Sequence, residues 1–369
     1  MIYHKLTNDF YDKFLYSGLI IMDPFSKKVS LGLQGKFTAE KKENENLFYI
    51  NDFFSEKSFF WNTPLDLTVT TLNEFEDFLK LQLYKKPQLN WLKPDLENYQ
   101  HQFLSLMELI SQGHLSKGVP YSSESAHYIS SSEHLTYLLL HACCYLKQAQ
   151  GYLYGFWNQE EGILGVTPEI LFQKQNLSVQ TIALAGSRKN TLTAQDEIFY
   201  ETNMLQDKKI KHEHEFVKLG ILNDLKHLGE CKVEDTEVVR LPHMSHLKTG
   251  ISVFLNTEIE FHQLVSVLHP TPALGVWPKN LQGNSWLRSC NLMLGRGYHG
   301  APIGFQLSAQ KAFCLVAIRN VQWNNCAQNI KIVAGGGVVL QSILQDEWQE
   351  ALYKIQSVKN IFCLNPGDA

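Results

Sequence analysis

The sequence has little of what marks secreted, membrane or disulfide-bonded proteins. Its seven cysteines are an odd, scattered set without a CxxC spacing, which argues against a disulfide framework and favours a reduced, cytoplasmic protein. The apolar patch at residues 19–22 is far shorter than the roughly 20 residues needed to span a bilayer. Residues 1–5 do not open an apolar signal core with a cleavage site. We therefore expect no membrane segment and no secretory leader.

The charge balance excludes another group of functions. Lysine and arginine number 33 against 37 aspartates and glutamates, which gives a formal net charge of -4. No broad basic surface follows from this, so binding to nucleic acid or to an acidic membrane is not expected. The 369 residues are 44% hydrophobic and 19% charged, as in a globular protein with a substantial core. Any affinity for anions must be local.

The chain contains no repeat, linker or low-complexity tract that would mark a domain boundary. Residues 1–95 are predicted to form strands and turns, interrupted by Asp23-Pro24, and they carry no recognisable chemistry. Periodicity predicts helices at residues 99–110, 133–146, 196–228 and 345–362, an antiparallel meander at 151–184 and a strand pair around Asn324-Asn325. Strands and helices come in blocks, so we expect an α+β fold in one large domain, with residues 1–95 as its strand-rich N-terminal part.

One acidic residue lies in the apolar stripe of the helix predicted at 196–228. At steps of three and four residues, the stripe contains Ile210, Glu213, Val217, Ile221 and Leu225. A carboxylate facing the core needs a partner, although a position at the stripe's edge explains it equally well. The neighbouring His212 and His214 are two residues apart, without the four-residue spacing of a zinc-binding helix, so zinc is rejected.

The C-terminal helix has the same anomaly. Its stripe contains Glu347, Glu350, Lys354, Val358 and Ile361. Glu350 and Lys354 form at least a helix-stabilising pair of about 0.3 kcal/mol. The functional alternative is that Glu213 and Glu350 meet across the core and bind a hard divalent cation, for which oxygen ligands suit Mg²⁺.

Three further patterns could serve an anionic ligand or acid–base chemistry. Gly335-Gly336-Gly337 follows a predicted strand, so its N–H groups could converge on an anion, although a glycine triplet is more often a turn. Arg319 is predicted on one strand face with Phe313, Leu315 and Ala317, where a carboxylate would be its partner. Glu169 opens a strand among apolar residues, and burial would raise its pKa and make it a candidate general acid. Lys117, taken alone, would be assigned to the surface.

Taken together, these motifs resemble the chorismate-binding enzyme family over roughly residues 100–362. The matching elements are Thr167-Pro168-Glu169, Leu184-Ala185-Gly186-Ser187-Arg188, Glu213-His214, His246-Leu247-Lys248-Thr249, Leu268-His269-Pro270-Thr271-Pro272-Ala273, Arg296-Gly297-Tyr298-His299-Gly300, Ala317-Ile318-Arg319, the glycine triplet, and Glu347 to Lys354. The resemblance implies packed antiparallel sheets with helices outside, a chorismate site with Mg²⁺, and residues 96–369 as the catalytic region.

The resemblance also implies a role for each site residue. Lys117 becomes the general base that activates water for attack at C2 of the ring, and Glu169 the general acid that protonates the departing C4 hydroxyl. Glu213 and Glu350 become Mg²⁺ ligands, with Glu347 beside them. The implied substrate-binding residues are Ser187, His246, Thr249, Ala273, Leu274, Arg319, Gly335, Gly336, Gly337 and Lys354.

Two positions resemble the isochorismate synthase branch of the family. Lys117 resembles the water-adding enzymes, since anthranilate synthases have glutamine there, and residues 269–274 resemble the HPTPA element of isochorismate synthases. The sequence departs from the family pattern at Ser122, Ile210, Val276 and Leu292, none of which is a proposed acid, base or metal ligand.

Other functions stay open at this point. A salicylate synthase or another chorismate-converting enzyme is the nearest alternative, and a catalytically silent relative that binds chorismate is the alternative of a different class. Chorismate is the expected small-molecule partner. We expect a monomer that could channel its product to an isochorismate-using enzyme, and the sequence does not distinguish menaquinone, siderophore and salicylate pathways.

Overall fold

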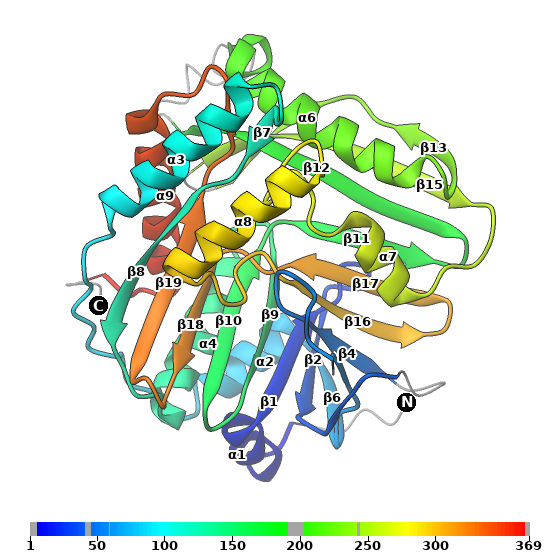
Figure 1. Cartoon of the computed structure of the whole chain (residues 1–369). Helices are drawn as coiled ribbons and strands as arrows, with labels where there is room; N and C mark the ends of the chain where they lie inside the picture. The colour runs from blue at the N-terminus through cyan, green and yellow to red at the C-terminus, as the bar shows by residue number, and fades with distance from the viewer. Residues whose placement is uncertain (1–5, 41–45, 59, 191–202, 242–243, 366–369) are drawn as a thin grey trace.

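The computed structural model describes residues 6–40, 46–58, 60–190, 203–241 and 244–365. In these residues, two antiparallel sheets pack against each other and helices cover their outer faces (Figure 1). This confirms the predicted α+β class with antiparallel sheets inside and helices outside.

The first sheet brings together strands from both ends of the chain. Its spatial order is β6 (Asp66–Thr71), β2 (Lys28–Leu33), β1 (Gly18–Met22), β9 (Tyr152–Trp157), β10 (Glu161–Thr167), β18 (Asn320–Asn324), β19 (Asn329–Gly335) and β8 (Tyr121–His127). The predicted strand pair around Asn324-Asn325 is confirmed as β18 and β19.

The second sheet contains the longest strands. Its order is β13 (Gly229–Val233), β15 (Met244–Leu255), β12 (Ser178–Lys189), β11 (Ile170–Gln175), β17 (Lys311–Val316), β16 (Pro302–Ser308), β4 (Leu47–Ile50), β5 (Trp61–Asn62) and β3 (Phe37–Thr38), and β14 (Glu237–Arg240) also pairs with β15. A separate small sheet pairs β7 (Lys117–Gly118) with β20 (Val338–Val339), which brings Lys117 next to the segment that follows the glycine triplet.

The helices are divided between the two outer faces. They are α1 (Asn8–Tyr16), α2 (Leu72–Leu79), α3 (Leu96–Ser111), α4 (Ser132–Leu146), α6 (Lys208–Leu225), α7 (Phe261–Leu268), α8 (Leu281–Leu294) and α9 (Leu344–Ile361). Figure 1 shows α6 and α7 against the second sheet, and α9 beside α3 and β19. The predicted helices at 99–110, 133–146 and 345–362 are therefore confirmed as α3, α4 and α9.

Side-chain alternation along the strands separates the layers of the core. In β1, Leu19 and Ile21 lie between the two sheets, whereas Ile20 faces the helices outside the first sheet. In β17, Phe313 and Leu315 join the same inter-sheet layer, while Cys314 faces the helices outside the second sheet. A strand with both faces buried in this way holds its register, because a slip of one residue would exchange the two layers.

The structure corrects three expectations about secondary structure. Residues 1–95 are not only strands and turns, because α1 and α2 lie among their strands. The segment 151–184 is not one meander: β9 and β10 pair in the first sheet, but β11 and β12 pair in the second. The helix predicted at 196–228 is interrupted at Asp207: residues 203–206 are helical, and α6 begins at Lys208, where Asp207 accepts a hydrogen bond from Ile210 N as the N-cap. Residues 196–202 lie outside the described part.

In the part of the chain that the structure describes, the helices are all too short or too polar to cross a lipid bilayer.

A glycine at the bulge between β12 and β15 gives the first prediction. Gly186 has a φ of 74°, and a Cβ there would lie 2.7 Å from the carbonyl oxygen of Ile210 in α6. We expect Gly186→Ala to lower the free energy of unfolding in urea by about 2 to 4 kcal/mol, because backbone strain adds to a steric clash. Gly113→Ala is the matched control, since its φ is 77° and no atom lies within 4 Å. An equal loss in both variants would show that the clash with α6 contributes nothing.

Candidate active site

Three carboxylates from two helices meet at the glycine triplet. Glu213 lies on α6, and Glu347 and Glu350 lie on the first turns of α9. A Cβ at Gly337 would overlap Oε1 of Glu213, and a Cβ at Gly336 would lie 3.2 Å from Oε1 of Glu350 and 3.4 Å from Oε2 of Glu347. The two helices therefore bring their acidic side chains against one short loop, as the stripes of the sequence predict for Glu213 and Glu350.

The glycines act here by their small size. None of residues 335–337 has a φ in the left-handed region, so the loop does not form a nest, whose alternating backbone conformations require such an angle. The absence of a Cβ instead allows the carboxylates and Lys117 to lie against the backbone. The physical reason for glycine is close approach to side chains rather than an unusual backbone turn.

Each of these carboxylates has a lysine partner. Lys209 Nζ lies 2.6 Å from Glu347 Oε1, and Lys354 Nζ donates a hydrogen bond of 2.6 Å to Glu350 Oε1. The third pair is looser, since Lys117 Nζ is 4.0 Å from Glu213 Oε1. The three formal negative charges are thus balanced by three positive ones inside a largely buried cluster, which avoids the large penalty of an uncompensated buried charge.

The pKa values of the three acids are shifted by their burial and by the charges around them. Burial raises the pKa of Glu213, which Lys117 partly opposes and Glu350 reinforces. Burial and the nearby charge of Glu350 raise the pKa of Glu347 to about 7. Burial alone would also raise the pKa of Glu350, but Lys354, Lys209 and Arg319 together outweigh it and hold this pKa below its usual value. Such repulsion between acids is what a bound cation would relieve.

The donor set fits a hard divalent cation by its chemistry, because every candidate ligand is a carboxylate oxygen. Its arrangement in this structure does not yet form a coordination shell. Among the described residues, no three His, Cys, Asp or Glu side chains are grouped so as to hold a metal ion. The acids face their lysines instead, so binding of a cation requires these ion pairs to open.

The candidate base Lys117 and the candidate acid Glu169 are both buried close to this cluster. Lys117 is completely buried, and its Nζ donates a hydrogen bond of 2.6 Å to the carbonyl of Pro272. Burial lowers the pKa of Lys117, which Glu213 partly opposes. Burial raises the pKa of Glu169 to about 7, with Lys117, Lys354 and Arg319 each lowering it in part. The environments therefore move these two pKa values toward each other and toward neutrality.

Glu169 and Arg319 lie where the chain passes from one sheet to the other. Glu169 follows β10 of the first sheet and precedes β11 of the second, and Thr167 Oγ1 accepts a hydrogen bond of 3.1 Å from its N–H. Arg319 lies in the return passage from β17 to β18. Both side chains are placed by topology at the end of the inter-sheet layer.

The structure corrects the predicted placement of Arg319 on a strand. β17 ends at Val316, and Arg319 has a φ of 56° in the connection that follows. Tyr154 donates a hydrogen bond of 2.8 Å to the carbonyl of Ile318, and Val166 N–H donates one of 3.1 Å to the carbonyl of Arg319. These bonds hold a backbone conformation that a residue with a Cβ seldom adopts.

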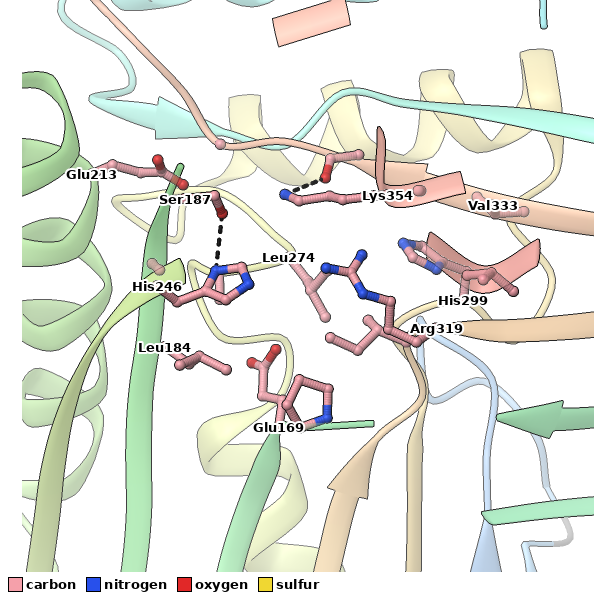
Figure 2. A pocket seen from close by; sticks show the side chains of 18 residues that line it. Glu169, Leu184, Ser187, Glu213, His246, Leu274, His299, Arg319, Val333 and Lys354 are labelled. Atoms are coloured by element: carbon pink, nitrogen blue, oxygen red, sulfur yellow. Dashed lines mark hydrogen bonds between the residues drawn. The ribbon is translucent and has the colours of Figure 1, made fainter. Parts of the chain in front are cut away.

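A small cavity of about 60 Å³ lies between these groups (Figure 2). Figure 2 shows Glu169 on one side, Glu213 and Lys354 on the other, and His246 and Arg319 between them. Ser187 Oγ lies 3.0 Å from His246 Nδ1, while His246 Nε2 has no hydrogen-bond partner among the described residues. Burial, with Arg319 and Lys354, lowers the pKa of His246 well below its usual value, so its imidazole is neutral.

The predicted site residues divide into two groups by position. Those that line the cavity are Glu169, Ser187, Glu213, His246, Ala273, Leu274, Arg319, Gly335, Gly337 and Lys354. Lys117, Gly336, Glu347 and Glu350 lie behind this lining, next to the carboxylate cluster. Thr249 also lies outside the lining, and its hydroxyl is 2.7 Å from His214 Nε2 and 2.8 Å from Thr236 Oγ1.

Sequence reasoning assigned no role to His299, which lines the cavity beside Arg319 (Figure 2). It is 3% exposed, and neither ring nitrogen has a hydrogen-bond partner among the described residues. Burial lowers the pKa of His299 well below its usual value, and Arg296, Arg319, Lys354 and Lys331 add to the effect. The sequence offered only one signal for His299, its position in the matching element at residues 296–300, because the cavity is formed by segments distant in the sequence.

Residues 36–363 match the family of chorismate binding enzymes, so the chain belongs to this family. Curated relatives include the isochorismate synthase MenF of Pasteurella multocida, 27% identical over 212 residues that cover 56% of this chain and 48% of the relative. Another is EntC of Escherichia coli K12, an isochorismate synthase with 27% identity over 55% of this chain and 51% of the relative. The chain thus spans about half the length of the curated relatives it matches.

The family also contains relatives with a different reaction. Anthranilate synthase component 1 of Saccharolobus solfataricus is 24% identical over 56% of this chain and 49% of the relative. Family membership therefore includes more than one chorismate-converting enzyme.

Solved structures share the fold over nearly the whole chain. DhbC from Bacillus anthracis matches with a TM-score of 0.78 and 21% identity, covering 98% of this chain and 100% of that one. MenF from Escherichia coli gives 0.78 and 16%, with coverage of 97% and 92%. Anthranilate synthase component I from Streptococcus pneumoniae gives 0.67 and 17%, with coverage of 92% and 89%.

The buried carboxyl of Glu169 gives a prediction that needs no activity. Its pKa is about 7 in the folded chain against an ordinary 4.5, so the folded state binds this proton more tightly than the unfolded state. Stability from the neutral form is therefore present below pH 4.5 and is lost as the pH rises through 7. We expect Glu169→Gln, in urea unfolding without divalent cations, to gain up to about 3 kcal/mol over the parent between pH 4.5 and pH 8.

The exposed Glu160 supplies the control for this measurement. Glu160→Gln should follow the parent across the same pH range, because the substitution changes only an exposed side chain. Stability curves of Glu169→Gln and parent that stay parallel would contradict the assigned burial effect.

Proposed function

We propose that this protein is an isochorismate synthase, which converts chorismate to isochorismate by adding water at C2 and releasing the hydroxyl at C4. The observation that carries the proposal is the buried pair of Lys117 and Glu169, whose environments lower one pKa and raise the other. A reaction that removes a proton from water and returns one to a leaving hydroxyl needs these two groups. The relatives named isochorismate synthases support the same reaction.

In the proposed mechanism, neutral Lys117 accepts a proton from a water molecule whose oxygen forms a bond to C2. The ring double bonds shift, and the bond between C4 and its hydroxyl breaks as Glu169 donates its proton to the leaving oxygen. The reaction is balanced, since one water enters and one leaves. The pKa of Glu169, about 7, leaves much of this carboxyl protonated at neutral pH.

The substrate is a dianion, and the cavity offers it positive charge at two places. Arg319 forms no ion pair among the described residues, so its guanidinium is available to the enolpyruvyl carboxylate. Lys354 lies near the loop of residues 335–337, where the ring carboxylate would bind, and donates a hydrogen bond of 2.9 Å to the carbonyl of Gly335. The proposed lining of the ring is His246, Ser187, Ala273 and Leu274.

We propose Glu213 and Glu350 as the ligands of one Mg²⁺, with Glu347 beside them. When bound, Mg²⁺ would supply a fixed positive charge that holds the ring carboxylate. In this structure the acids are paired with Lys117, Lys209 and Lys354. A cation would pair with the acids, and the dianion would pair with the cationic side chains. Each ligand therefore offsets the charge that the other brings, so their binding should be cooperative.

The names of the relatives point to more than one pathway that uses isochorismate. Relatives named EntC and MenF are isochorismate synthases, and a relative in Pseudomonas aeruginosa is named for salicylate biosynthesis. The monomeric state, the cytoplasmic location and channelling of the product to a next enzyme remain predictions of the sequence.

The test of the proposed reaction is product analysis by chromatography. Purified protein with chorismate and Mg²⁺ should form isochorismate reversibly, without ammonia and without salicylate or anthranilate. Lys117→Ala should lower the rate by roughly 10²-fold or more because the water loses its base. Salicylate with pyruvate would identify a salicylate synthase instead. Absence of turnover at every Mg²⁺ concentration would indicate a silent chorismate-binding relative.

The charge balance of the cluster predicts a thermal response that does not depend on turnover. In the Glu169→Gln background, Mg²⁺ alone and chorismate alone should each raise Tm little, and both together should raise it by clearly more than the sum. Glu213→Ala and Glu350→Ala should remove this excess, because each deletes a charged oxygen ligand.

The exposed Asp346 on the same turn of α9 is the matched control, and Asp346→Ala should keep the full response. An additive response in the Glu169→Gln protein, or an excess that both glutamate variants keep, would contradict the metal assignment.

A further inference from the structure

A second cavity, of about 660 Å³, adjoins the site cavity and shares Pro168 and Leu184 with it. Its remaining lining comes from both sheets and the end of α4, and consists of Met22, Lys27, Leu146, Ala149, Gln150, Gly151, Tyr152, Ile170, Gln173, Ile182, Val239, Leu241 and Lys248. We call it the entrance groove. None of the residues to which the proposed reaction gives a role lies in this groove.

Strand register places residues of the groove and of the site cavity on one face of the second sheet. In the pairing of β12 with β15, Leu184 lies opposite Lys248, and beyond the bulge Ser187 lies opposite His246. Lys248 and His246 are two residues apart on one strand, so their side chains point to the same face of the sheet. That face runs from the groove, past Leu184, directly to the residues that line the site.

The sign of the charge in the groove suits an anion. Lys27 and Lys248 are its charged lining residues, and no acidic side chain is among the described residues of the lining. Lys27 Nζ lies 4.1 Å from the ring centroid of Tyr152, and Lys248 Nζ donates a hydrogen bond of 2.8 Å to the exposed Glu237 outside the groove. Two cations along a hollow path raise the local concentration of a dianion.

Size also distinguishes the two cavities. Ligand pockets for small organic molecules usually measure about 300 Å³ or more, whereas the site cavity has about 60 Å³. A dianion of the proposed substrate's size therefore fits the groove before any rearrangement, and it enters the site only when side chains at the boundary and in the ion pairs move.

We propose that the entrance groove is a docking position and path for the dianionic substrate, in which Lys27 and Lys248 attract its carboxylates before it passes Pro168 and Leu184. This inference rests on the proposed function for the identity of the dianion. It assigns Lys27 and Lys248 to the capture of the substrate and assigns no residue to the reacting atoms.

The test is a steady-state comparison of chorismate conversion at several ionic strengths. The double variant Lys27→Gln/Lys248→Gln should lower kcat/KM by about 10-fold at low salt through KM, with kcat at the parental value. The difference should disappear near 0.5 M salt, where the Debye length is only a few ångströms. Lys13→Gln is the control, because Lys13 forms an exposed pair of 2.7 Å with Asp9 far from the groove.

A variant that fills the groove tests the path itself. Ile182 lines the groove but not the site cavity, so Ile182→Trp should also lower kcat/KM while kcat is kept. A double lysine variant with parental kcat/KM and salt dependence overturns the proposal, as does an Ile182→Trp that changes kcat alone. A parent protein that neither binds nor converts chorismate would instead refute the proposed function, and with it the occupant of the groove.

Discussion

Charge compensation inside a buried cluster is the constraint on which the site depends. Glu213, Glu347 and Glu350 come from two helices and meet at glycines whose lack of a Cβ leaves room for them. Burial of three carboxylates without partners would cost a large free energy of folding. Each of them therefore lies beside a lysine. The same lysines and acids are the groups that a cation and a dianion would use. The arrangement that keeps this site folded is thus also the arrangement that a ligand pair must take apart.

The two-sheet architecture explains why acid, base and cation come from distant segments. The chain crosses from the first sheet to the second just after β10 and returns just after β17, and these crossings place Glu169 and Arg319 at the same end of the inter-sheet layer. Their backbones are held by hydrogen bonds to neighbouring strands, including that from Tyr154 to the carbonyl of Ile318. Rigid strands on both sides of a crossing fix a side chain more closely than a long loop could.

The helices were predicted from the sequence because their formation depends on local periodicity. The helices that carry Glu213 and Glu350 followed from apolar stripes, and the unusual acids in those stripes do face the interior. Arg319 shows the limit of this reasoning. Burial continues without a break from Ala312 to Ala317, but the backbone leaves the strand at Val316, and no local pattern marks that change. The same holds for β10 and β11, whose separation into different sheets is decided by pairing with β18 and β17. His299 was missed because only long-range packing gives it cavity exposure.

The size of the site cavity places a further demand on the proposed chemistry. Lys354 cannot remain paired to Glu350 at 2.6 Å while Glu350 binds a cation and Lys354 meets a carboxylate. On the proposed function, the ion pairs therefore exchange partners when ligands arrive, so that acids turn to the cation and lysines to the dianion. The exchange keeps every acid and every lysine beside an opposite charge within a space of about 60 Å³. Because neither ligand alone offers partners to both the acids and the lysines, the lysine-paired state disfavours the binding of a single ion.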